Sequence, residues 1–173
     1  MYITYKKKKQ VNKDTFIQDL EIILILHNTL YARNVAEIFQ LAKSYRIKEI
    51  IITGDSANPP FGKDLSKASQ SEEKKVTWSI QPDILKVITD LKRKKFKLIS
   101  IDYAEESKSL FDSSFNDAKI ALIIGNESTG LSREIISKLN NTYYIPNNLN
   151  SGVLSTNLST AIALSMIIFK NKK

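Results

Sequence analysis

The sequence predicts an α/β fold in which a mostly parallel sheet carries helices on both faces. Short apolar runs of the kind that form buried strands alternate with longer segments whose apolar residues recur at helical spacing. The 173 residues show no internal repeat and no linker between two halves. This length suits a single domain with a substantial core. We therefore expect a domain at residues 21–173, preceded by an N-terminal extension at residues 1–20.

The first half of the expected domain is predicted to hold two strands, two helices and a long loop. Residues 21–26 and 47–53 are apolar and rich in β-branched side chains, as buried strands are. Residues 34–45 and 82–95 carry apolar residues on one helical face. Residues 54–75 are polar, and a loop of this length in a domain is usually functional or mobile.

The second half continues the same alternation. We expect strands at 96–101, 119–124 and 142–145, and helices at 107–111, 131–139 and 160–169. The basic run at 92–95 is interpreted as the exposed end of a helix, where cations complement the helix dipole. The aromatic residues Trp78, Tyr143 and Tyr144 are interpreted mainly as packing residues.

The composition excludes several kinds of chemistry. The chain has no cysteine, so disulfides, thiol nucleophiles and cysteine zinc sites are excluded. His27 is the only histidine, and no nucleophile-elbow sequence accompanies it. We expect no metal site. No run reaches the ~20 apolar residues of a membrane helix, and the basic start lacks a signal-peptide core. A cytoplasmic location is the default expectation.

The net charge of +8 favours an anionic partner. Nucleic acid is the natural candidate, because cationic side chains that neutralise phosphates release counterions. Lysine is abundant along the whole chain, however, and only four arginines are present. A solvated, lysine-rich surface therefore stays open as the alternative explanation.

The segment from Ala121 to Ser132 is the most informative part of the chain. An apolar run ends in Gly125-Asn126-Glu127, and Gly130 follows before a helix-like stretch. This pattern predicts a buried strand that delivers a polar loop to one edge of the sheet. Ligands bind at the carboxyl ends of strands in open α/β sheets, where such loops gather. We expect Glu127 to act on whatever binds there.

A second polar segment precedes the last helix. Ile145-Pro146 ends a short strand, an Asn-rich loop follows, and Ser155-Thr156-Asn157 introduces the apolar helix. Serine and asparagine commonly cap helices, and a helix start behind a polar loop can also hold a polar ligand. A simple helix cap and a ligand site both fit this segment.

Together these segments resemble the TrmH/SpoU branch of the SPOUT methyltransferases. Gly125 to Gly130 is similar to the family's second motif, and Ile145-Pro146 with Ser155 to Ser159 is similar to its third. The first motif resembles Leu26-His27-Asn28 followed by Asn34 to Phe39. The resemblance covers about residues 22–170, and three motifs in the right order are specific.

The resemblance implies a fold and a reaction. It implies a SPOUT-type α/β knot, in which the C-terminal segment threads a loop to form a trefoil knot, and it implies a homodimer. The apolar face of the last helix, with Ile162, Met166, Ile167 and Phe169, is available for such a contact, and core packing within the protomer explains the same face equally well. The implied reaction moves a methyl group from S-adenosylmethionine to a ribose 2′-hydroxyl of tRNA or rRNA.

The resemblance also implies the site residues. It places the cofactor against the following residues: Gly125, Asn126, Glu127, Gly130, Ile145, Leu154, Thr156 and Asn157. It assigns catalytic roles to Asn34, Glu127, Ser155 and Asn157. Glu127 and Asn157 are expected to organise the surrounding loops through hydrogen bonds.

The chain departs from the family at a catalytic position. The family usually places an arginine six residues after the asparagine of its first motif, and Gln40 stands there. Glutamine forms hydrogen bonds but supplies no positive charge. Arg33, beside Asn34, is a candidate substitute. Two functions stay open: an active RNA 2′-O-methyltransferase, and a degenerate family member that binds RNA without efficient methylation.

Overall fold

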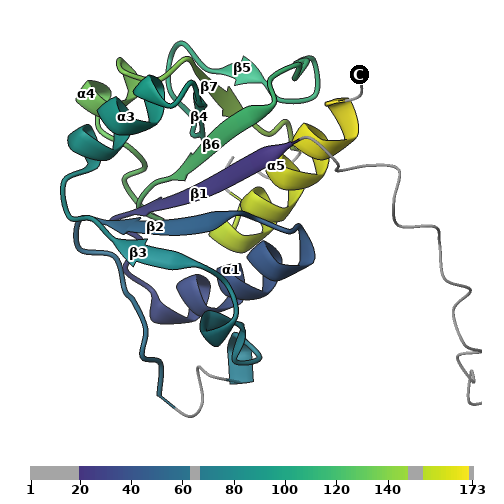
Figure 1. The fold of residues 1–173 in the computed structure, drawn as a ribbon. Helices are drawn as coiled ribbons and strands as arrows, with labels where there is room; N and C mark the ends of the chain where they lie inside the picture. Colours follow the sequence, from purple (N-terminus) through teal and green to yellow (C-terminus); the bar gives the residue numbers. More distant parts are fainter. Residues whose placement is uncertain (1–19, 63–66, 148–153, 172–173) are drawn as a thin grey trace, which may run out of the picture.

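The computed structural model describes residues 20–62, 67–147 and 154–171. Across these residues the strands form one sheet in the order β3-β2-β1-β6-β4-β7-β5, and every adjacent pair is parallel (Figure 1). The strands are β1 (Glu21–His27), β2 (Glu49–Thr53), β3 (Trp78–Ile80), β4 (Lys97–Ile101), β5 (Lys108–Ser109), β6 (Lys119–Ile124) and β7 (Asn141–Tyr144). The predicted α/β class with a parallel sheet is confirmed.

Helices cover both faces of the sheet, as predicted. They are α1 (Ala32–Ser44), the 3-10 helix η2 (Glu72–Lys74), α3 (Ile84–Arg93), α4 (Arg133–Ile136) and α5 (Thr156–Lys170). Helices α1 and α5 lie on one face, and α3 and α4 lie on the other (Figure 1). Alternate residues of β1 serve the two faces: Leu24 packs with α1 and α5, whereas Ile25 packs with α3 and α4.

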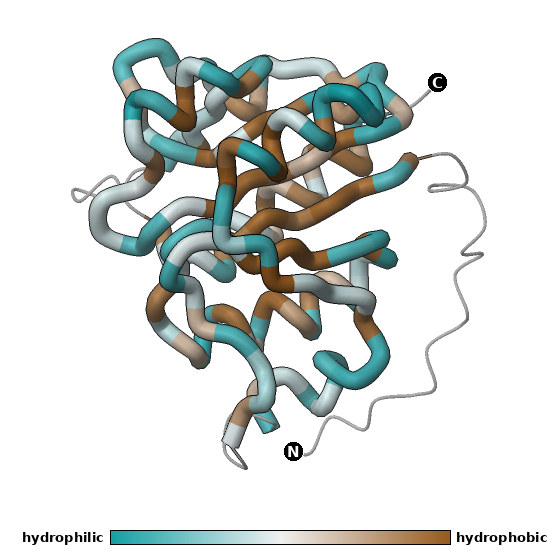
Figure 2. Tube along the Cα trace, turned by 60° about the vertical axis from the view of Figure 1, so that its left-hand side comes forward, coloured by the Kyte–Doolittle hydropathy of each residue, from teal (hydrophilic) through white to brown (hydrophobic). Residues whose placement is uncertain are grey.

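The core follows the apolar strands through the centre of the domain. Figure 2 shows hydrophobic residues concentrated along the inner strands and hydrophilic residues along the outer turns of the helices. Phe39 on α1 is fully buried and meets Phe61 and Trp78 edge to face, with ring centroids 5.8 and 6.3 Å apart. Tyr143 is also buried in the core. The packing roles expected for Trp78 and Tyr143 are confirmed.

The predictions for two short segments differ from the structure. Residues 107–111 were expected to form a short helix, but Lys108–Ser109 is strand β5, which pairs with β7. Residues 78–80 were not expected to form a strand, yet β3 pairs with β2. Both are short edge strands, and two or three residues are too few to show a period in the sequence. Pairing with a longer neighbour decides their conformation.

The helix boundaries are set by their capping residues. Asp83 accepts from the backbone N–H of Leu85 and Lys86, so α3 begins at Ile84. Ser155 accepts from the N–H of Leu158 at 3.4 Å, so α5 begins at Thr156, four residues before the predicted start. Helix α4 is much shorter than the predicted 131–139.

The C-terminal helix supports only part of the expectation for a contact surface. Ile167 is fully buried against the sheet, because it belongs to the core between α1 and α5, so it is not available to a partner. Ile162 and Met166 are half-buried, and Phe169 is exposed. The path of 148–153, on which the predicted knot depends, and the predicted extension at 1–20, except Leu20, lie outside the described residues.

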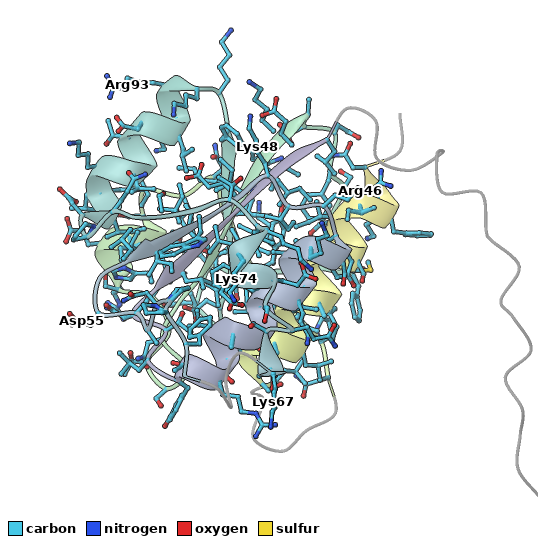
Figure 3. The ribbon with its side chains drawn as sticks, turned by 60° about the horizontal axis from the view of Figure 1, so that its bottom comes forward. Arg46, Lys48, Asp55, Lys67, Lys74 and Arg93 are labelled. Carbon is cyan, nitrogen blue, oxygen red and sulfur yellow. The ribbon has the colours of Figure 1, made fainter. Side chains whose placement is uncertain are left out.

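Because the strands are parallel, they all begin at one edge of the sheet, the amino edge, and every connection from a helix to the next strand arrives there. Figure 3 shows Arg46, Lys48 and Arg93 on this amino edge, whereas Asp55 lies toward the opposite edge. The basic run at 92–95 is the exposed end of α3, as interpreted from the sequence. Within the described residues, no helix is long and apolar enough to cross a membrane.

Candidate active site

The predicted polar loop lies at the carboxyl edge of the sheet, where neighbouring connections diverge. The chain leaving β1 continues to α1 on one face, and the chain leaving the adjacent β6 continues to α4 on the other. Such a divergence leaves a crevice at the strand ends, where α/β proteins bind ligands. The loop between β6 and α4 opens onto this crevice.

The loop requires glycine at both ends. Asn126 and Gly130 exchange backbone hydrogen bonds of 3.2 and 3.0 Å, which close a tight turn. A Cβ on Gly125 would lie 2.8 Å from the Gly130 carbonyl carbon. Gly130 has a φ of +65°, and a Cβ there would lie 2.5 Å from an Asp102 oxygen. Side chains at either position would therefore distort the loop.

Glu127 ties this loop to the start of α1. Its carboxylate accepts from the backbone N–H of Leu30 at 3.2 Å and of Tyr31 at 3.4 Å. It also accepts from Asn34 Nδ2 at 3.0 Å. A carboxylate is favoured here because the free N–H groups of a helix start carry partial positive charge. Glu127 thus organises the loops through hydrogen bonds, as expected.

Asn126 joins the same two loops through its side chain. Asn126 Nδ2 donates to the Asn28 carbonyl at 2.9 Å, and its Oδ1 accepts from the N–H of Ser128 and Thr129. Asn28 itself has a φ of +54° and accepts from the Asp55 N–H at 2.9 Å. The ends of β1, β2 and β6 are therefore held in one hydrogen-bonded group.

Asp102 and Tyr103 supply the far wall of the crevice from the end of β4. Asp102 Oδ2 accepts from the Leu131 N–H at 2.7 Å, directly behind Gly130. The Tyr103 hydroxyl donates to the Ile145 carbonyl at 2.7 Å and accepts from Asn147 at 2.7 Å. These contacts connect the loop after β4 to the loops after β6 and β7.

A cavity of about 280 Å³ lies among these loops. Its lining comprises Ile101, Asp102, Tyr103, Ile124, the segment Gly125–Gly130, Leu154, Thr156 and Ser159. Most of the residues predicted to hold the cofactor therefore surround one cavity. Ile145 is buried beside it and does not line it. Ser155 is exposed and caps α5.

Asn157 belongs to a separate group on the α1 side. Asn157 Nδ2 donates to Glu37 Oε2, and Arg33 Nε donates to Glu37 Oε1 at 3.0 Å. These residues line a second cavity of about 360 Å³ together with Gln40, Leu41 and Ala68. The structure thus brings Arg33, Gln40 and Asn157 to one cavity. Glu37, which also lines it, lies one turn of α1 beyond Asn34.

Sequence reasoning missed Asp102, Tyr103 and Glu37. For the first two a signal was present, since the apolar run of β4 ends in a polar residue just as the run of β6 does. Glu37 lies within Asn34 to Phe39, the segment that resembles the family's first motif, but the resemblance assigns it no role. It stands among apolar neighbours on α1, and only the folded arrangement places it against Asn157, 120 residues later in the chain.

His27 ends β1 beside the crevice as a neutral side chain. Its Nδ1 lies 2.9 Å from Thr53 Oγ1, which itself donates to the Leu26 carbonyl, so Nδ1 carries the hydrogen. Its Nε2 then accepts from Asn28 at 3.3 Å. Burial lowers the pKa of His27 from its ordinary value, and the nearby Asp55 carboxylate offsets this only in part.

We expect folding to become less stable as the pH falls below about 6.5. In that range the unfolded chain gains a proton on His27 before the folded chain does, so the free energy of unfolding falls. This fall ends once the pH passes below the lowered pKa of His27 in the folded state. NMR titration of the single histidine should give a pKa below 6.5. His27→Gln should remove this contribution to the pH dependence of urea unfolding, and a histidine pKa above 6.5 would contradict the assignment.

Solved structures identify the class of fold. The chain aligns with the A. aeolicus TrmH/SpoU tRNA modifying enzyme at a TM-score of 0.77 and 17% identity, over 90% of this chain and 77% of that one. An AdoMet-bound rRNA methyltransferase from Sinorhizobium meliloti gives 0.77 and 19%, over 89% and 58%. A protein studied for 2-OH methylation of C/U34 on tRNA gives 0.74 and 16%, over 88% and 97%. The fold is that of the TrmH/SpoU methyltransferases.

The sequence itself establishes the family. Residues 21–167 match the model of the SpoU rRNA methylase family, which covers most of the chain. The protein therefore belongs to the SpoU rRNA methylase family, and the resemblance drawn from its motifs is confirmed. No curated protein matches the chain.

Proposed function

We propose that the protein transfers a methyl group from S-adenosylmethionine to a ribose 2′-hydroxyl of tRNA or rRNA. It is an RNA methyltransferase by family. The observation that carries the assignment is the glycine-lined loop, which Glu127 ties to the start of α1 beside a cavity at the carboxyl edge. Related folds with this cofactor bound support the choice of methyl donor.

The residues around the cavity fit S-adenosylmethionine. A cavity of about 280 Å³ is at the small end for a ligand of this size, but an adjoining cavity of about 480 Å³ shares Asp102, Tyr103 and Thr129 with it. The glycines let the loop close tightly beside the cavity, since a Cβ at either position would clash within the protein. The backbone of Gly125–Gly130 with Leu154 and Thr156 would hold the cofactor, which supplies an activated methyl on a sulfonium.

The remaining chemical requirements concern the acceptor, the ribose 2′-hydroxyl. A ribose hydroxyl is a poor nucleophile near neutral pH, so the protein must place it in line with the methyl and take up its proton. Sulfonium methyl transfer requires no metal, and the described residues contain no group of three His, Asp or Glu arranged for one. Asn34, held by Glu127, is proposed to fix the start of α1 in position for this step.

Arg33→Ala is expected to lower methyl transfer about 100-fold while cofactor affinity changes little. The Arg33 side chain is 78% exposed, and its exposed pair with Glu37 contributes little to stability. The guanidinium is therefore available to an RNA phosphate, where a lost electrostatic contact costs about 10²–10³ in rate. The change should appear in kcat/KM for RNA, with the cofactor Kd measured by calorimetry. Unchanged kcat/KM would refute Arg33 as the substitute for the absent arginine.

Gln40 favours a second candidate function. Gln40, which is uncharged, lines the cavity shared with Arg33 and Asn157, and the family usually places an arginine at this position. A degenerate member would bind RNA, with or without cofactor, and methylate it poorly. Cofactor binding alone does not separate the two candidates. Single-turnover methyl transfer on RNA from the parent cell does, because it measures the chemical step directly.

We also propose a homodimer with a knotted C-terminal region in a cytoplasmic protein. Exposed apolar side chains support self-association: Leu158 and Phe169 on α5, and Leu30 and Tyr31 before α1. Light scattering with size-exclusion chromatography tests the dimer, and a strictly monomeric protein would count against it. The domain from residue 21 onward is proposed to carry the whole activity.

One experiment tests the proposed function most directly. The purified protein is incubated with methyl-labelled S-adenosylmethionine and total RNA from the parent cell, and the labelled nucleotide is then mapped. We expect label in a 2′-O-methylated nucleotide of tRNA or rRNA. Label on a base, or no transfer under single-turnover conditions, would overturn the assignment.

A further inference from the structure

The cavity between α1 and the first turn of α5 has the features of a built site. It has a volume of about 360 Å³ and is lined by Arg33, Glu37, Gln40, Leu41, Ala68 and Asn157. Asn157 Oδ1 is buried and has no hydrogen-bond partner within the described part of the chain. A buried polar atom without a partner is costly, so it indicates a group that binds there.

This cavity lies next to the glycine-lined one. Thr156 and Ser159 line the glycine-lined cavity, while Asn157, from the same helical turn, lines the second. On the other side, Glu127 lines the first cavity and bonds Asn34, one turn of α1 before Glu37. A substrate in the second cavity would therefore stand beside a methyl donor held in the first.

Among the described residues that line the second cavity, Glu37 is the one carboxylate. Arg33 and Asn157 each donate to a different oxygen of it, and this fixes the orientation of the group. The other polar side chains cannot take up a proton near neutral pH: guanidinium stays charged, and the amides of Gln40 and Asn157 are not basic. A carboxylate oxygen is the one group among these that can accept a proton.

We propose that this cavity receives the acceptor ribose and that Glu37 accepts the proton of its 2′-hydroxyl. The inference rests on the proposed function. The ribose O–H bond breaks as the oxygen forms its bond to the methyl carbon, and the electron pair of the broken carbon–sulfur bond stays on sulfur. The proton passes to a Glu37 oxygen, so the carboxylate becomes neutral while the sulfonium becomes a thioether. Asn157 Oδ1 accepts from a donor of the bound RNA other than this hydroxyl, which is the only free hydroxyl of a ribose inside the chain.

Glu37→Gln tests the role with almost no change in shape. Glutamine keeps an oxygen that accepts from Asn157, but it cannot take up the proton. We expect kcat at saturating RNA and cofactor to fall at least about 100-fold, within the range for general-base catalysis. The Kd for cofactor, by calorimetry, and for RNA, by filter binding, should stay within about twofold of the wild type. Glu37→Asp keeps a carboxylate and should recover part of the rate.

A split between kcat and the two dissociation constants separates a proton acceptor from a structural residue. A structural role for Glu37 would weaken RNA or cofactor binding together with kcat, whereas a proton acceptor lowers kcat alone. Glu134→Gln, an exposed position on α4, is the matched control and should leave the rate and both dissociation constants unchanged.

The outcomes distinguish the inference from the proposed function. An active wild type with Glu37→Gln within about threefold of it overturns the role of Glu37 and leaves the methyltransferase assignment standing. Equal losses in RNA binding and rate make Glu37 a binding residue and also overturn the role. A wild type that methylates no RNA overturns both.

Discussion

Glu127→Ala is expected to lower methyl transfer at least about 100-fold and to weaken cofactor binding about tenfold. The Glu127 carboxylate is the common acceptor for Leu30, Tyr31 and Asn34, so its removal frees the β6–α4 loop from the start of α1. The glycine-lined cavity and the start of α1 are then no longer held in a fixed position relative to each other. A displacement of about 1 Å is enough to cost about 100-fold in rate. A tenfold loss of affinity corresponds to about 1.4 kcal/mol.

Rate and cofactor affinity should be measured together for this variant. Single-turnover methyl transfer gives the rate, and calorimetry gives the Kd. Glu127→Gln keeps the shape and an acceptor oxygen but loses the charge, so it should fall between the wild type and Glu127→Ala. Both variants should unfold near the wild-type temperature, because Leu30 and Tyr31 are exposed and their N–H groups can bond water. A fully active Glu127→Ala would show that the contact between these loops is dispensable.

Periodicity predicted the parts of the fold that are long and buried. β1, β2 and β6 are apolar runs, and β4 is interrupted by the buried Ser100, because both faces of each strand are covered by helices. The same reasoning failed for β3 and β5, which have three and two residues. The conformation of these edge strands depends on pairing with β2 and β7, and no local pattern encodes it.

The site residues also divide into those that the sequence predicted and those that it missed. Motif similarity found the loop of Gly125–Gly130 and named Glu127 and Asn34 as site residues, because each stands in a recognisable sequence. The structure adds that these two side chains are in contact. Asp102 was missed because its role depends on the β4 end lying against Gly130, a neighbour relation set by strand order. Glu37 was missed for the same reason, since Asn157 reaches it only after α5 packs along α1. The motifs do not encode contacts between segments that are far apart in the sequence, and these contacts place Asp102 and Glu37 in the site.

Gly130→Ala is expected to destabilise the fold by about 1–3 kcal/mol and to weaken cofactor binding at least about tenfold. The φ of +65° at Gly130 is strained for any residue with a Cβ. The new Cβ would also approach Asp102 Oδ2 to 2.5 Å. Asp102 would have to move away, and its 2.7 Å bond to the Leu131 N–H, which holds the end of the loop, would be lost. Urea unfolding gives the stability, and calorimetry gives the cofactor Kd.

Gly62→Ala is the matched control, because a Cβ at Gly62 would meet nothing within 4 Å and its φ is not in the left-handed region. The same chemical change there should leave stability within about 0.5 kcal/mol and binding unaltered. The contrast between the two glycines therefore isolates the geometry of the loop from the general effect of an added methyl group. If Gly130→Ala bound cofactor as tightly as Gly62→Ala, the turn closed by Asn126 and Gly130 would not shape the cofactor pocket.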